Sequence, residues 1–126
     1  MIRTMARLRI TEHTVTVVLS VVEKVETLHR NVTVPRWAIL GARAVADGMA
    51  ETRGLRGLGT EVPGVVMAGM LSHQGARTFV ICHGRGPAVL IELSGQPFDR
   101  LLVTVDDPDA AVARLAPGMS SVWPEG

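Results

Sequence analysis

Several residue types that indicate a special environment or chemistry are rare in this sequence. Only 3% of its 126 residues are aromatic and tyrosine is absent, so aliphatic side chains have to fill the core. Cys82 is the single cysteine, which excludes an internal disulfide and a cysteine-rich zinc site. The core must therefore consist of valine, leucine, isoleucine, alanine and methionine, and the abundance of β-branched residues favours sheet.

Long apolar runs are also missing. The longest one, 62–71, contains Pro63 and two glycines and is much shorter than the roughly 18 residues that a membrane-spanning helix needs. Arg7, Arg9 and Glu12 interrupt the first residues, so no secretory leader is expected. We therefore predict a cytoplasmic protein without a transmembrane segment.

A strong net charge of either sign is absent. The formal charge of +1 provides no overall field that would attract nucleic acid, and nucleic-acid binding is not expected. The basic residues are nevertheless biased, because 12 of the 13 are arginine. A compositional bias of the coding sequence is one explanation, and recognition of planar anions by guanidinium groups is the functional alternative.

Short segments of β-type sequence fill the first half of the chain. Residues 6–10 and 14–19 flank a polar turn and predict a hairpin. Ser20 and Glu23 have the spacing of a capping box, and apolar residues at helical spacing follow, so a short inserted helix is predicted at about 21–29. Further short elements are expected after it: a strand at 32–34, one helical turn at 35–38 and an extended segment at 39–46.

The second half contains regularly spaced strand-like runs separated by glycine-containing turns. These predicted strands are 65–72, 78–83, 88–93 and 101–105. Such spacing is typical of an antiparallel sandwich or barrel. Asp107 suits the N-cap and Pro108 the first turn of a following helix, predicted at about 108–115 and ended by Pro117 and Gly118. Length and the lack of repeats predict one domain over 1–118 and a tail at 119–126.

This order of elements resembles the bacterial pleckstrin-homology (PH)-like domains. Three stretches carry the resemblance. The first is 20–29 running into 32–35, the second consists of 53–56, 59–60 and 63–65, and the third consists of 78–80, 87–93 and 103–115. The resemblance covers roughly residues 5–115 and implies a bent antiparallel barrel or sandwich, closed at one end by the C-terminal helix. Relatives with such folds serve as platforms for lipids, peptides or proteins. The resemblance assigns no catalytic residue, no cofactor and no binding residue to this chain.

The glycine-rich stretch 53–64 is predicted to form a long loop. A phosphate-binding P-loop is excluded because Gly59 stands where that motif requires lysine. The stretch is then either a connector or a binding loop whose Arg53 and Arg56 meet an anion or a carboxylate. With two further arginines near predicted turns, Arg77 and Arg85, these residues form the candidate binding site.

No catalytic or metal-binding constellation is found in the sequence. The four histidines are scattered and have no metal-ligand spacing, so no metal and no cofactor are predicted. Cys82 and His83 are adjacent in a predicted strand and point to opposite faces, which excludes a nucleophile–base pair. The aspartates near residue 107 are explained by the start of a helix.

These observations favour a non-enzymatic binding or scaffolding module. It would offer a strand edge or the 53–64 stretch to an unknown protein partner or to a second copy of itself. The first alternative is a protein that binds a small anion or an anionic lipid headgroup near Arg53, Arg56, Arg77 and Arg85. The second alternative is an enzyme of unrecognised type.

Overall fold

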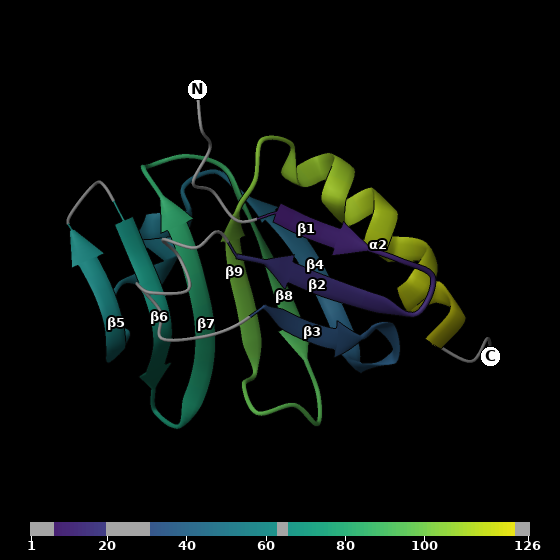
Figure 1. Ribbon diagram of the computed structural model, residues 1–126, viewed down its shortest axis with the longest axis horizontal. Helices are drawn as coiled ribbons and strands as arrows, with labels where there is room; N and C mark the ends of the chain where they lie inside the picture. Colours follow the sequence, from purple (N-terminus) through teal and green to yellow (C-terminus); the bar gives the residue numbers. More distant parts are fainter. Residues whose placement is uncertain (1–6, 20–30, 63–65, 123–126) are drawn as a thin grey trace.

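The protein is described by a computed structural model, which covers residues 7–19, 31–62 and 66–122 (Figure 1). The predicted inserted helix at 21–29 falls outside these ranges. The described chain is mostly β, with two sheets and one α-helix, and belongs to the α+β class. Neither sheet closes on itself within the described residues. No described helix combines the length and the apolar character that crossing a membrane requires.

The smaller sheet is antiparallel with the order β1-β2-β3. Its strands are β1 (Arg7–Ile10), β2 (Thr14–Val18) and β3 (Val32–Pro35). The predicted hairpin of β1 and β2 is confirmed, because Leu8 pairs with Val17 in antiparallel register. The predicted helical turn after β3 is the 3-10 helix η1 (Arg36–Ala38).

The larger sheet has six strands in the order β4-β8-β9-β7-β6-β5. Along the chain these are β4 (Ile39–Val45), β5 (Arg56–Val62), β6 (Val66–His73), β7 (Ala76–His83), β8 (Ala88–Leu93) and β9 (Arg100–Thr104). A 3-10 helix, η2 (Gly48–Thr52), connects β4 to β5. The four strands predicted in the second half of the chain are therefore present, with small differences at their ends.

One strand pair corrects the prediction of a wholly antiparallel arrangement. β9 lies parallel to β7, with Thr78 opposite Arg100 and Ile81 opposite Val103, and antiparallel to β8 on its other side. The residues 101–104 of β9 are all buried. A strand that is apolar on both faces is buried best in the middle of a sheet. β9 accordingly lies between β8 and β7.

Two cores lie on opposite faces of the larger sheet. Alternate residues of β7 separate them: Phe79 and Ile81 belong to the core shared with the smaller sheet, whereas Val80 and Cys82 belong to the second core. Figure 1 shows the smaller sheet in front of the larger one. The second core is covered in part by Met49 of η2, so η2 lies on the face away from the smaller sheet.

The α-helix α2 (Pro108–Val122) closes one end of the space between the sheets. It packs against β4, η1, β8 and β1, and Figure 1 shows it beside β1 and β4. Its Leu115 is fully buried in the core between the sheets. The predicted cap is confirmed, because the Ala110 backbone N–H donates to Asp107 Oδ1 at 3.0 Å.

The predicted end of this helix is wrong, because α2 continues past residue 115 and through Pro117. Proline lacks a backbone N–H and disturbs the carbonyls of the preceding turn. Pro117 leaves the carbonyl of Ala113 without its helical donor, and Arg36 donates to the next two carbonyls: its Nη2 lies 2.7 Å from the carbonyl oxygen of Arg114 and 3.4 Å from that of Leu115. The predicted tail is accordingly helical over 119–122, and its last four residues fall outside the described chain.

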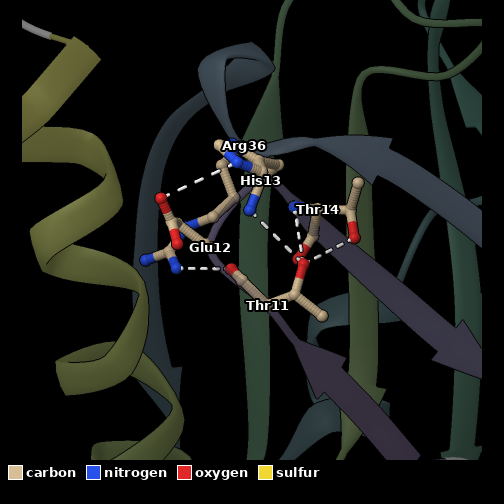
Figure 2. A network of polar contacts seen from close by, with 5 residues as sticks. All are labelled: Thr11, Glu12, His13, Thr14 and Arg36. Carbon is tan, nitrogen blue, oxygen red and sulfur yellow. Dashed lines mark hydrogen bonds and ion pairs between the residues drawn. The ribbon is translucent and has the colours of Figure 1, made fainter.

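Arg36 also holds the β1–β2 turn (Figure 2). Its Nη1 donates to the carbonyl oxygen of Thr11 at 2.6 Å, and its backbone N–H donates to that of His13 at 2.9 Å. The turn itself is fastened by Thr11 Oγ1, which accepts the Thr14 backbone N–H at 3.0 Å. One partly buried guanidinium group therefore joins the smaller sheet, η1 and the C-terminal helix.

The prediction of a loop over 53–64 is wrong for most of its length, because residues 56–62 form β5. The glycines of this strand are explained by close contact with β6. A Cβ atom at Gly57 would overlap the carbonyl oxygen of Met70, and one at Gly59 would overlap that of Ala68. These glycines allow a close strand pairing, which sequence reading mistakes for a turn.

Candidate functional site

A cavity of about 310 Å³ lies where η2, the segment 53–55 and the strands β5 and β6 meet. The turn between β7 and β8 reaches it through Arg85. Most of the cavity's apolar lining belongs to the face of the larger sheet that η2 covers, whereas Val66 belongs to the core shared with the smaller sheet. The position of the cavity is therefore set by the connection from β4 to β5, and not by the end of the sandwich that α2 closes.

Three of the four predicted arginines line this cavity: Arg53, Arg56 and Arg85. Arg53 follows the last residue of η2 and its backbone N–H donates to Ala50 at 3.4 Å. Arg56 is the first residue of β5. Both side chains are exposed, and neither has an ion-pair partner in the described part of the chain. Two guanidinium groups at the cavity are thus available to an external anion.

Arg85 differs from these two because a carboxylate already holds it. Its Nη1 lies 3.0 Å from Asp47 Oδ2. The other oxygen of Asp47, Oδ1, accepts the backbone N–H groups of Met49 at 3.0 Å and Ala50 at 3.3 Å, which makes Asp47 the N-cap of η2. A single carboxylate therefore fixes both the start of η2 and the position of Arg85 at the cavity.

Close packing keeps η2 in place beneath Arg85. The Gly48 backbone N–H donates to the carbonyl oxygen of Gly86 at 2.9 Å, which ties η2 to the β7–β8 turn. A Cβ atom at Gly48 would lie 2.8 Å from the Cβ of Ala88 and 2.9 Å from the Sγ of Cys82. Glycine at this position lets η2 approach β7 and β8 closely enough to form one wall of the cavity.

The fourth predicted arginine, Arg77, does not line this cavity. Its backbone N–H donates to Asp99 Oδ2 at 2.8 Å, and its Nη1 donates to the carbonyl oxygen of Pro97 at 3.1 Å. The Asp99 backbone N–H in turn donates to the Arg77 carbonyl oxygen at 2.8 Å. Arg77 therefore fastens the turn before β9 to the start of β7.

Apolar side chains form the other part of the cavity wall. Met49, Leu55, Val66 and Met67 line it. Met49, Leu55 and Met67 are partly buried and pack against the core that contains Val80 and Cys82. The cavity thus presents guanidinium groups together with a flexible apolar surface, because methionine side chains adapt easily to a neighbouring group.

One further carboxylate, that of Glu61 on β5, lines the cavity. The described lining has three guanidinium groups and this one carboxylate. Asp47, which is not part of the lining, binds Arg85, and the sum leaves one net positive charge. Sequence reading missed both acids and both methionines. An Asp-Gly pair such as Asp47-Gly48 is typical of a turn, whereas here Asp47 caps η2. Glu61 and Met67 reach the cavity only through the pairing of β5 with β6.

Among the described side chains, the Cys82 thiol is the strongest candidate for a nucleophile. Its surroundings lower its reactivity. It is completely buried in the second core. Burial raises the pKa of the Cys82 thiol to about 11, the Coulombic effect of Asp47 adds to this rise, and a hydrogen bond with Thr104 opposes it. The thiol is therefore protonated at neutral pH. The described residues also contain no group of three metal-ligating side chains that could hold an ion.

Comparison of the chain with protein-family models, with curated proteins and with solved structures found no match. Any assignment of function therefore depends on the geometry of the site. That geometry consists of two arginines without an ion-pair partner in the described ranges, a third arginine held by an aspartate, and an apolar wall.

Proposed function

We propose that this protein is a non-enzymatic binding module of PH-like fold and that the cavity lined by Arg53, Arg56 and Arg85 receives a small anionic ligand. The convergence of these arginines carries the proposal. Arg53 and Arg56 lie three residues apart at the junction of η2 and β5, Arg85 comes from the distant turn between β7 and β8, and the fold places all three around one hollow. Arginine donates several N–H groups in a planar arrangement that matches carboxylate and phosphate oxygens.

Within the part of the chain that the structure describes, Arg53 and Arg56 have no ion-pair partner, which supports an external partner for them. Two like charges beside one cavity repel each other, and among the described residues only Glu61 offers an opposite charge in the lining. A bound anion would remove this repulsion and add charge-assisted hydrogen bonds. Arg85 is already paired with Asp47, which fixes the position of its positive charge at the cavity.

The PH-like part of the proposal is supported by the layered arrangement of the chain. Two sheets face each other across one core, and the C-terminal helix closes one end of it. The non-enzymatic part is supported by the chemistry around the cavity. The guanidinium groups and the exposed carboxylate of the lining can bind charged groups of a ligand. The Cys82 thiol is buried and protonated, so it is a poor nucleophile.

Thermal unfolding in the presence of small anions tests this function. The panel is sodium octanoate, inorganic phosphate, citrate and dibutyl phosphate. A ligand present at 100 times its Kd stabilises the folded state by about 2.7 kcal/mol, which corresponds to a rise in Tm on the order of 10 °C for a domain of this size. We expect the rise with at least one anion. The double variant Arg53→Gln, Arg56→Gln should abolish it.

Arg77→Gln is the matched control, because Arg77 is an exposed arginine outside the cavity. It should retain the full ligand-dependent rise in Tm. The proposal fails if no anion of the panel stabilises the protein. It also fails if the stabilisation survives in the Arg53→Gln, Arg56→Gln variant, because the anion would then bind elsewhere.

A second candidate function is pairing with a protein partner or a second copy through β5. This strand ends the larger sheet, and in the described chain it pairs with β6 only (Figure 1). An outer strand has backbone donors and acceptors that another strand can use. Sedimentation from low to high micromolar concentration tests self-association, and a monomer over the whole range would remove that version.

A further inference from the structure

The charges around the cavity limit the charge of its ligand. Arg53 and Arg56 have no ion-pair partner among the described residues, whereas Glu61 lies in the same lining and Asp47 neutralises Arg85. One net positive charge matches an anion that carries a single negative charge. A dianion would add a second negative charge to a lining that already contains the Glu61 carboxylate, and like charges lower the affinity.

The apolar wall adds a second requirement. Met49, Leu55 and Met67 are only partly buried, so each has apolar surface that a ligand can cover. Burying apolar surface stabilises a complex. An inorganic anion leaves this surface in water, whereas an anion with an attached hydrocarbon group covers it.

The volume of the cavity sets the size of that hydrocarbon group. About 310 Å³ is at the small end of ligand sites. A cavity of this size suits a ligand with few non-hydrogen atoms. A carboxylate with a chain of about eight carbons is such a ligand, whereas a two-chain lipid is several times larger.

From these three features we infer that the ligand is a monocarboxylate attached to a short apolar group, with its carboxylate at Arg53 and Arg56 and its apolar part against Met49, Leu55 and Met67. This inference rests on the proposed function of the same cavity. Glu61 has the role of a selector that disfavours dianions. Two sources have this chemistry, a free short-chain fatty acid and the C-terminus of a peptide that ends in an apolar residue.

Isothermal titration at pH 8 with matched probes tests the inference. Octanoate should bind at least about ten-fold more tightly than octanamide, because the neutral amide lacks a charge-assisted contact. It should also bind at least about ten-fold more tightly than acetate, which lacks the methylene groups that cover the wall. N-acetyl-leucine and its amide form the peptide arm, and whichever acid binds more tightly identifies the source.

Two variants distinguish the effect of charge on ligand binding from the effect of the planar guanidinium geometry. Glu61→Gln should strengthen the binding of inorganic phosphate by about two- to five-fold, the range of an exposed charge interaction, and should change octanoate binding less. Arg53→Lys with Arg56→Lys keeps the charge and loses the planar donor pair, so octanoate binding should weaken. Circular dichroism and the Tm without ligand check that every variant is folded.

The outcomes distinguish this inference from the function on which it rests. If neither these probes nor the other anions bind in an Arg53- and Arg56-dependent way, the proposed function fails and the inference fails with it. If binding depends on these arginines but inorganic phosphate or dibutyl phosphate binds more tightly than both carboxylates, only the monocarboxylate inference is overturned. Tighter binding of octanoate or N-acetyl-leucine than of their neutral amides and of both phosphates supports it.

Discussion

Raising the pH should destabilise this protein through one buried thiol. Cys82 lies on β7 with no exposed surface, and burial raises its pKa from 9.0 to about 11. In the unfolded chain the thiol loses its proton near pH 9, whereas in the folded chain it keeps the proton to higher pH. The folded state therefore binds more protons between these two values. Its stability is complete below pH 9 and falls as the pH rises toward 11.

The size of the effect follows from the shift of the pKa. Each pKa unit corresponds to about 1.4 kcal/mol, so the shift from 9.0 to about 11 corresponds to about 3 kcal/mol in full. By pH 11, where half of the folded molecules would be deprotonated, about 2 kcal/mol of the free energy of unfolding should be lost. This is a large fraction of the total stability of a small domain.

Urea denaturation at intervals from pH 8 to pH 11, in the presence of a reductant, measures this loss. Cys82→Ala is the matched variant, because it lacks the thiol. Few other groups titrate between pH 8 and pH 11, because the sequence contains no tyrosine and Lys24 is its only lysine. Lys24 and the terminal amine titrate in both proteins, so the difference between the two pH profiles belongs to Cys82.

At pH 8 the variant should be less stable than the wild type by about 1 kcal/mol, a typical cost for a small change in a core. The difference should vanish or reverse by pH 11, because only the wild type loses the contribution of the thiol. If both proteins lose stability in parallel between pH 9 and pH 11, the Cys82 thiol is not protected by burial and the reasoning is refuted.

Two further predictions concern residues that hold the fold together, and both use urea denaturation at pH 7.5. Gly57→Ala should lower the free energy of unfolding by about 1–3 kcal/mol, because the new Cβ meets the backbone carbonyl of Met70, which cannot move away freely. Gly86→Ala is its control, since a Cβ there has nothing within 4 Å, and equal losses would contradict the close strand contact. Arg36→Met should cost about 2–3 kcal/mol, because charged hydrogen bonds to carbonyls of the β1–β2 turn and of α2 are lost. Arg43→Met removes only an exposed ion pair of 3.4 Å and should cost less than about 1 kcal/mol, so similar costs for the two variants would count against the role of Arg36.

Local patterns predicted most of the strands correctly, because a strand repeats every two residues whatever it pairs with. The predicted strand at 88–93 has the bounds of β8, and the burial of Cys82 and the cap at Asp107 also follow from neighbouring residues. β5 was missed because its glycines resemble turn residues. The alternation of Leu58 and Thr60 between those glycines was the available indication of a strand.

Part of the candidate site was also predictable from local sequence patterns. Arginine side chains in a glycine-rich stretch marked Arg53 and Arg56 as candidates, and the structure places Arg85 with them. Arg77 lies apart, because it belongs to the start of β7 and contacts the turn before β9. No periodicity relates Asp47 or Glu61 to the cavity, since only the packing of η2 and the pairing of β5 bring them there.

The sequence by itself determined the class of the fold, the position of most strands, and the start of the C-terminal helix at Asp107. These features depend on residues close together in the chain, so a single sequence contains the information. Tertiary structure decided which strands are neighbours, how far α2 extends, and which arginines share a cavity. Each of these depends on contacts between distant segments, such as Arg36 with the carbonyl oxygen of Arg114 or Asp47 with Arg85, and no local pattern encodes such contacts.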